Sequence, residues 1–113
     1  MFLDDEFGYQ FKKEHDMLTK KFYKTKDEAE VTFEFCRDNV NSVSLVAEFT
    51  DWQPMEMTYS KKLKVFRTKV KLPKDGDFHF RYLVDNAEWE NDPAADNYLP
   101  NDFGTDNSVV STY

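Results

Sequence analysis

The sequence lacks several features that would by themselves indicate a class of protein. Cys36 is the only cysteine among 113 residues, which excludes an intrachain disulfide and a four-cysteine zinc site. No apolar stretch is long enough to span a bilayer. The first residues are acidic and lead into no apolar run, so we expect no secretory signal and a cytoplasmic location.

An excess of positive charge is also missing. The chain carries 15 Lys and Arg against 22 Asp and Glu, a formal net charge of −7. Binding to nucleic acid or to an anionic membrane surface depends on Lys and Arg that neutralise phosphates. We therefore expect neither partner, whereas an uncharged ligand such as a polysaccharide remains compatible with this charge.

Recognisable catalytic motifs are absent as well. His15 and His79 have no nucleophile motif nearby. The many carboxylates could in principle supply a glycosidase pair, but a single domain of this length offers little depth for a catalytic cleft. The acidic residues of one late segment fit no calcium-loop template; they are Asp92, Asp96, Asp102 and Asp106. We expect a protein that is not an enzyme and holds no metal or cofactor.

The sequence is rich in aromatic residues, at 17%, and its apolar residues alternate with polar ones. A period of two predicts β-strands whose apolar side chains share one face. The residues expected to point inward are Val31, Phe33, Phe35, Val43, Leu45, Ala47, Phe49, Phe66, Thr68, Val70, Leu72, Phe78, Phe80, Tyr82 and Val84. Short strands separated by turns predict an all-β chain folded as an antiparallel β-sandwich.

Other segments complete this expected organisation. Residues 1–16 read as an N-terminal extension, either a short helix or a loosely ordered terminus, and residues 17–113 as one domain. A lysine-rich first strand is expected over residues 18–24, with its lysines protecting a sheet edge. An irregular stretch is expected over 91–107, followed by a last strand over 108–111.

Two tryptophans stand among turn-forming residues rather than in the predicted core. Trp52 follows a strand in Phe49-Thr50-Asp51-Trp52, and Trp89 follows another in Asp85-Asn86-Ala87-Glu88-Trp89. A flat amphipathic ring at a loop position suits a binding surface better than a core. The C–H face of a sugar ring is a ligand that such a platform can cover, so the sequence favours a sugar chain.

The order of five short motifs resembles a known family. They are Phe49-Thr50-Asp51-Trp52, Leu72-Pro73-Lys74-Asp75-Gly76, the strand from Phe78 to Asn86, Trp89-Glu90-Asn91-Asp92-Pro93 and Phe103-Gly104-Thr105-Asp106-Asn107. Over residues 40–112 they resemble the glycogen-binding module of the AMP-activated kinase beta subunit. They are equally similar to the isoamylase-type early set domain of glycogen branching and debranching enzymes. The segment before them resembles small stand-alone bacterial proteins built on this domain.

The resemblance implies an immunoglobulin-like, early set sandwich and a set of sugar contacts. Those contacts fall on Trp52, Arg81, Trp89, Phe103, Thr105 and Asn107. Arg81 replaces the usual lysine, Thr50-Asp51 replaces an Asn-x pair, and Phe103 replaces a smaller aliphatic residue. The bulkier Phe103 leaves the preferred glucan shape open. Tyr59 and Tyr98 are further aromatics that could extend the surface.

Five of these six sugar contacts also have a purely structural interpretation. Trp52 could cover the core, Trp89 could pack against Pro93, and Arg81 could pair with Asp85 or Glu88. Asn107 could cap a turn, and Phe103 could anchor in the core.

Two function classes follow. The first is a non-catalytic module that binds an α-1,4-glucan such as glycogen or a maltooligosaccharide and recruits itself or a partner, such as a glycogen-metabolising enzyme or a kinase. The second is a protein-interaction module with the early set fold and no affinity for sugar.

Overall fold

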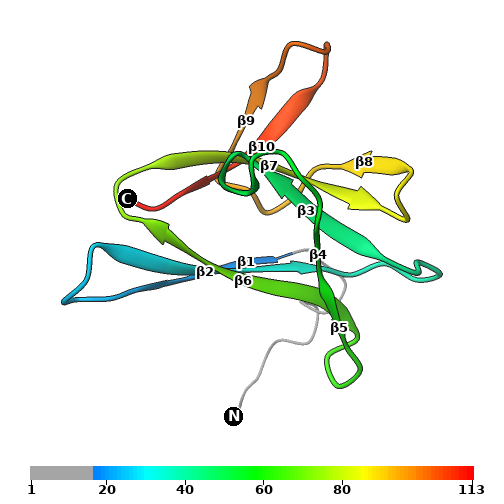
Figure 1. The fold of residues 1–113 in the computed structure, drawn as a ribbon, viewed down its shortest axis with the longest axis horizontal. Helices are drawn as coiled ribbons and strands as arrows, with labels where there is room; N and C mark the ends of the chain where they lie inside the picture. The colour runs from blue at the N-terminus through cyan, green and yellow to red at the C-terminus, as the bar shows by residue number, and fades with distance from the viewer. Residues whose placement is uncertain (1–16) are drawn as a thin grey trace.

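Two antiparallel β-sheets pack face to face in the computed structural model, which describes residues 17–113 (Figure 1). The strands of the first sheet are, in spatial order, β1 (Met17–Phe22), β2 (Glu28–Phe35), β6 (Val65–Pro73) and β5 (Thr58–Ser60). Those of the second are β4 (Met55–Glu56), β3 (Val43–Ala47), β7 (Asp77–Val84), β10 (Asp106–Ser111) and β9 (Asn97–Pro100), with β8 (Glu88–Glu90) paired to β7. The predicted immunoglobulin-like antiparallel β-sandwich is confirmed.

The core lies between the sheets and is built from the predicted alternation. Val31, Phe33 and Phe35 of β2 are buried, as are Phe80 and the next two inward residues of β7. The rings of Phe33 and Phe80 meet edge to face with centroids 5.0 Å apart. Burying one large apolar side chain stabilises the fold by about 1.5–3 kcal/mol, so these inward faces fix the register of both sheets.

The strand predicted to reach Phe49 ends earlier, at Ala47. The chain then turns into a short 3-10 helix, η2 (Glu48–Thr50). Thr50 drives this turn, because its Oγ1 accepts from the Ala47 backbone N–H at 2.9 Å and donates to the Ala47 carbonyl at 3.0 Å. Phe49 still packs on the core, with its ring centroid 5.9 Å from that of Phe33.

Three short strands, β4, β5 and β9, were not expected, and β8 was expected to be a loop. Strand β9 lies inside the stretch predicted to be irregular, and β10 begins at Asp106, two residues before its predicted start. All four residues of β9 are exposed, so the strand has no inward apolar face that alternation could reveal. Its pairing with β10, which places Leu99 opposite Asn107, gives it its regular conformation.

Strand β1 is an edge strand, as its lysines predicted, and it ends at Phe22. The expected N-terminal extension over residues 1–16 lies outside the described residues. Within residues 17–113, no helix has the length and apolar character needed to cross a bilayer.

Candidate functional site

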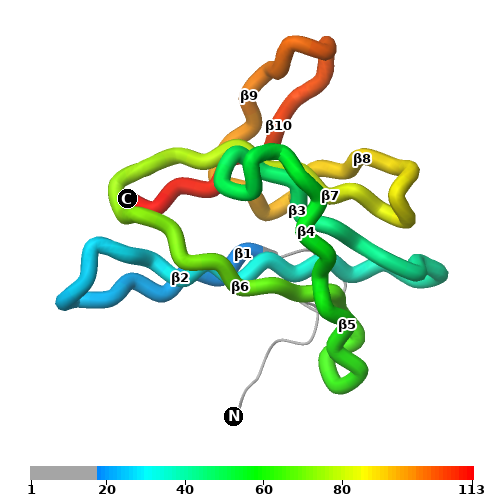
Figure 2. Tube along the Cα trace, viewed as in Figure 1, coloured from blue at the N-terminus to red at the C-terminus, as the bar shows by residue number. Residues whose placement is uncertain are grey.

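Two hairpins diverge from one edge of β7. The other edge of β7 is occupied by β3, which pairs with residues 80–84. The edge of β7 that faces away from β3 pairs with β10 up to Phe80 and with β8 from Tyr82 onward. The β7–β8 and β9–β10 hairpins run apart from this point, as the tube view shows (Figure 2). Arg81 lies where they separate, so the hairpins form a fork with Arg81 at its base.

Trp89 is carried by one arm of the fork. Asp85 and Asn86 both adopt left-handed backbone conformations, with φ of 52° and 55°. Asp and Asn tolerate this region, and two such residues make the tight turn that suits a β-hairpin. The turn sets Trp89 opposite Leu83, on the outer face of the sheet. Trp89 is therefore on a strand rather than in a loop, and 48% of its surface is exposed.

Within residues 17–113, Arg81 contacts the Trp89 ring and forms no ion pair with an acidic side chain. Its guanidinium carbon lies 5.3 Å from the ring centroid, within the range of a cation–π interaction. Glu88 forms its ion pair with Arg37, at 3.7 Å. Among residues 17–113, the buried Nε of Arg81 has no hydrogen-bond partner. A buried donor without a partner costs free energy.

A hollow of about 520 Å³ lies between the two arms. Arg81, Trp89, Asn91 and Tyr98 are among the residues that line it. Tyr98 lies at this hollow, where its hydroxyl donates to the Asp92 carbonyl. Tyr59 does not, because it lies on β5 in the other sheet, where its ring packs on Phe66 with centroids 5.0 Å apart.

Asp92 holds the base of the fork together. Its carboxylate accepts hydrogen bonds from Tyr82 Oη and from the Ala94 N–H, both at 2.7 Å. Its own backbone N–H donates to Ser108 Oγ at 2.9 Å, which ties the segment to β10. Burial raises the pKa of Asp92 above its ordinary value, the two hydrogen bonds to its carboxylate oppose this, and the charge of Asp96 adds to it. Asp92 is therefore a buried structural residue and does not belong to an open acidic loop.

The second arm of the fork is the β9–β10 hairpin, and Asn101 organises its tip. Its Oδ1 accepts from the backbone N–H of Phe103 at 2.9 Å and of Thr105 at 3.2 Å. Thr105 Oγ1 also bonds the Asn101 side chain, through Nδ2 at 2.8 Å. Phe103 projects from this tip with 89% of its surface exposed, so it is not a core anchor.

Asn107 differs from its expected environment. It lies on β10, it is only 8% exposed, and it does not stand free in an irregular segment. Its Oδ1 accepts from Asn101 Nδ2 at 3.0 Å, and its Nδ2 lies 3.1 Å from Nδ1 of His79. Asn107 therefore links β7 to the tip that carries Phe103.

Trp52 stands on the opposite side of β7 from these arms. Asp51 and Trp52 both have left-handed backbone conformations, with φ of 59° and 58°, and the Trp52 N–H donates to the Ala47 carbonyl at 2.8 Å. Ala47 pairs with Phe80, the neighbour of Arg81, so the backbone of Trp52 is anchored beside the base of the fork. The side chain is 43% exposed and is not buried in the core.

The structure thus brings five of the six predicted site residues to the two arms and the base of the fork. These are Arg81, Trp89, Phe103, Thr105 and Asn107. Among the ring contacts and hydrogen bonds of residues 17–113, Trp52 has none to these five side chains. Asp92, Asn101 and His79 were not predicted to shape the site. Asp92 lay in one of the matched motifs, and Asn101 also carried a possible signal, because an Asn three residues before Gly104 is typical of a tight loop.

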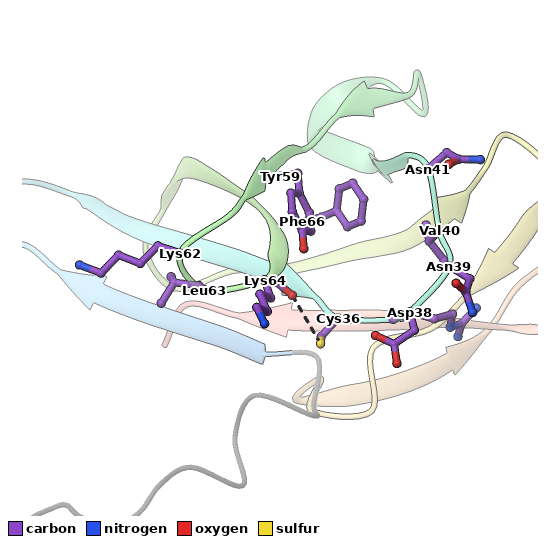
Figure 3. Close-up of a pocket in the computed structure, with 11 residues that line it drawn as sticks. Cys36, Asp38, Asn39, Val40, Asn41, Tyr59, Lys62, Leu63, Lys64 and Phe66 are labelled. Carbon is purple, nitrogen blue, oxygen red and sulfur yellow. Dashed lines mark hydrogen bonds between the residues drawn. The ribbon is translucent and has the colours of Figure 1, made fainter.

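A second and larger hollow, of about 1130 Å³, shares Arg37 with the first. It lies between the β2–β3 connection and the β5–β6 turn, where the Cys36 thiol donates a weak hydrogen bond to the Lys64 carbonyl (Figure 3). None of the six predicted site residues lines it. Within residues 17–113, no group of three or more His, Cys, Asp or Glu side chains is placed to hold a metal ion.

The sequence of this chain matches a known protein family. The family described as the glycogen recognition site of AMP-activated protein kinase matches residues 29–112. The chain belongs to this family. The match runs from the second residue of β2 through β10, and this glycogen-recognition family is a non-catalytic carbohydrate-binding module.

Solved structures of similar fold belong to larger proteins. The ferric enterobactin esterase of Salmonella typhimurium aligns with a TM-score of 0.66 and 11% identity, over 90% of this chain and 35% of the esterase. The enterochelin esterase of Shigella flexneri aligns with a TM-score of 0.66 and 13% identity, over 90% of this chain and 34% of that one. This chain spans about a third of each esterase, and at these identities the likeness concerns the fold alone. A comparison with curated protein sequences finds no match.

Proposed function

We propose that this protein binds α-1,4-glucan chains, such as those of glycogen, through the fork and Trp52. The observation that carries the proposal is the base of the fork, where the Arg81 guanidinium lies against the Trp89 ring while 48% of the Trp89 surface stays exposed. Membership of the glycogen-recognition family supplies the class of ligand.

The chemistry of the fork suits a sugar chain. A pyranose ring has apolar C–H faces and a rim of hydroxyl groups, so it needs flat apolar platforms and a few fixed donors and acceptors. Trp89 and Trp52 supply two platforms on opposite sides of β7. Arg81 supplies donors at the base, and Thr105 supplies a hydroxyl on the second arm. Asn107, which bonds Asn101 and contacts His79, is the contact proposed where the second arm meets β7.

Phe103 gives the second arm an apolar surface. Its exposure of 89% far exceeds that of either tryptophan, and it stands at the tip of the β9–β10 connection. Water around so large an exposed ring is released when a sugar face covers it. We assign Phe103 the role of an outer contact that holds a glucan chain in the fork. A glycogen-metabolising enzyme or a kinase is the partner that such a module would bring to its polymer.

Turnover of glucan by this protein is not expected. The family is non-catalytic, and the carboxylate best buried in the fork, Asp92, already accepts hydrogen bonds from Tyr82 and Ala94. Purified protein incubated with amylose or maltoheptaose should release no new reducing ends and form no branched product. Turnover that disappears in a carboxylate variant would contradict this expectation.

Retention on a polymer tests the proposal directly. The protein should be retained by amylose or glycogen beads, should be released by free maltoheptaose, and should not be retained by cellulose. Cellulose is the matched control because its glucose units have the same chemistry with a β linkage, which gives a flat rather than a curved chain. Protein that passes through all three matrices would favour the protein-interaction module.

A further inference from the structure

We propose that His79 is a positioning residue for the second arm of the fork, and that taking up a proton on His79 weakens glucan binding. The inference rests on the proposed function for its effect on affinity. The geometry behind it does not depend on a ligand. A series of polar contacts leads from His79 on β7 through Asn107 and Asn101 to the tip that carries Phe103.

The hydrogen bonds of Asn101 fix the orientation of both side-chain amides in this series. The atom that accepts from the backbone N–H groups of Phe103 and Thr105 must be the carbonyl oxygen, because a backbone N–H can only donate. The amide nitrogen of Asn101 then donates to Thr105 Oγ1 at 2.8 Å and to Asn107 at 3.0 Å. The Asn107 atom that receives this bond must be its oxygen.

The same logic assigns the proton on His79. With Asn107 Oδ1 turned to Asn101, Asn107 Nδ2 faces His79 Nδ1 at 3.1 Å. Since Nδ2 is a donor, this contact is a hydrogen bond only when Nδ1 accepts, that is, when the ring carries its hydrogen on Nε2. A proton added at Nδ1 would set two donors against each other. Relief requires Asn107 to turn its oxygen to His79, which removes the acceptor of the Asn101 bond.

Charged groups approach His79 from β7 and from η2. On β7, Asp77 and Arg81 lie two residues away on the same outer face. From η2, Glu48 Oε1 accepts the His79 backbone N–H at 2.7 Å. From β10, the register partner Val109 and Asn107 carry no titratable group. Glu48 therefore bonds the His79 backbone rather than its ring, Asp77 bonds Ser111 Oγ, and Arg81 contacts Trp89.

The consequence is a proton-dependent tip. Imidazole side chains ordinarily change charge between pH 5 and 8. Loss of the Asn101–Asn107 hydrogen bond removes one of the contacts that hold the loop carrying Thr105 and Phe103 in place. A contact held less firmly binds a ligand more weakly, because ordering it then costs conformational entropy on binding.

The test uses two variants of the full chain and two readouts. His79→Asn places an amide oxygen near the position of Nδ1 and cannot titrate, whereas His79→Leu removes the acceptor. Affinity for maltoheptaose is measured by calorimetric titration from pH 7.5 to pH 5.5. The backbone amide signals of Phe103 and Thr105 are followed by NMR over the same range without sugar.

Wild-type affinity should fall about three- to tenfold on acidification, as expected for the loss of one hydrogen bond. His79→Asn should keep the high affinity at every pH, and His79→Leu should show the low affinity at every pH. The Phe103 and Thr105 signals should follow one titration in the wild type and none in His79→Asn. Signals that stay constant in the wild type, or a His79→Leu variant with unchanged affinity, would overturn the proposal. If no form binds maltoheptaose, the proposed function fails, and the amide titration alone decides whether His79 positions the tip.

Discussion

Replacing Trp89 with alanine is expected to lower the affinity for maltoheptaose by roughly thirtyfold or more, while the protein stays folded. Removing one stacked aromatic anchor costs about 2 kcal/mol or more of binding free energy. The same change removes the surface on which Arg81 is placed, so the donors at the base of the fork lose their orientation. Trp52→Ala should have a comparable effect from the other side of β7.

Tyr59→Ala is the matched control for these variants. Tyr59 and Trp89 are equally exposed, at 48% each, but Tyr59 lies on β5 in the other sheet. Calorimetric titration and thermal melts of all three variants separate binding from folding. Tyr59→Ala should bind as the wild type does, and both tryptophan variants should melt within a few degrees of it. Tryptophan variants that unfold, or that retain wild-type affinity, would show that these rings serve the core instead.

Replacing Asp92 with alanine is expected to destabilise the fold by about 2–4 kcal/mol. The side chain is fully buried and accepts hydrogen bonds from Tyr82 Oη and the Ala94 N–H, both of which alanine abolishes. Denaturant unfolding of the variant measures the loss. The exposed Asp102, changed to asparagine, is the control and should leave the free energy of unfolding nearly unchanged.

The raised pKa of Asp92 also gives this residue a defined dependence on pH. Because the folded state holds the proton more tightly than the unfolded state, the contribution to stability is fully present below the ordinary carboxyl pKa of about 4. It is lost as the pH rises through the higher pKa of the folded state. Asp92→Asn cannot ionise, so its stability relative to the wild type should increase over this range and then stay level. A difference that decreases with rising pH would contradict the assignment.

The sequence predicted the central strands because they carry a repeated signal. Val31, Phe33 and Phe35, like Phe80 and Tyr82, alternate with polar residues, and burial on one face explains both the pattern and the fold. The turn at Asp85 and Asn86 was also expected from residue type alone. The matched family motifs then indicated which outer-face residues belong to one site.

The arms of the fork could not be predicted in the same way. Strand β8 has three residues and β9 has four, and neither alternates between a buried and an exposed face. Their conformations come from register with β7 and β10, which depends on contacts distant in sequence. The Asp92–Tyr82 bond and the Asn107–His79 contact span 10 and 28 residues, so local pattern carries no trace of them.

Calorimetric titration of the wild-type protein with maltoheptaose, with cellohexaose as the control ligand, tests the central claim most directly. A shallow site for an uncharged ligand should bind maltoheptaose with a Kd of about 10 µM to 1 mM, with little dependence on salt. Cellohexaose, a straight chain of the same sugar, should give no saturable heat. Equal binding of both sugars, or no binding of maltoheptaose, would contradict the assignment of this fork as an α-glucan site.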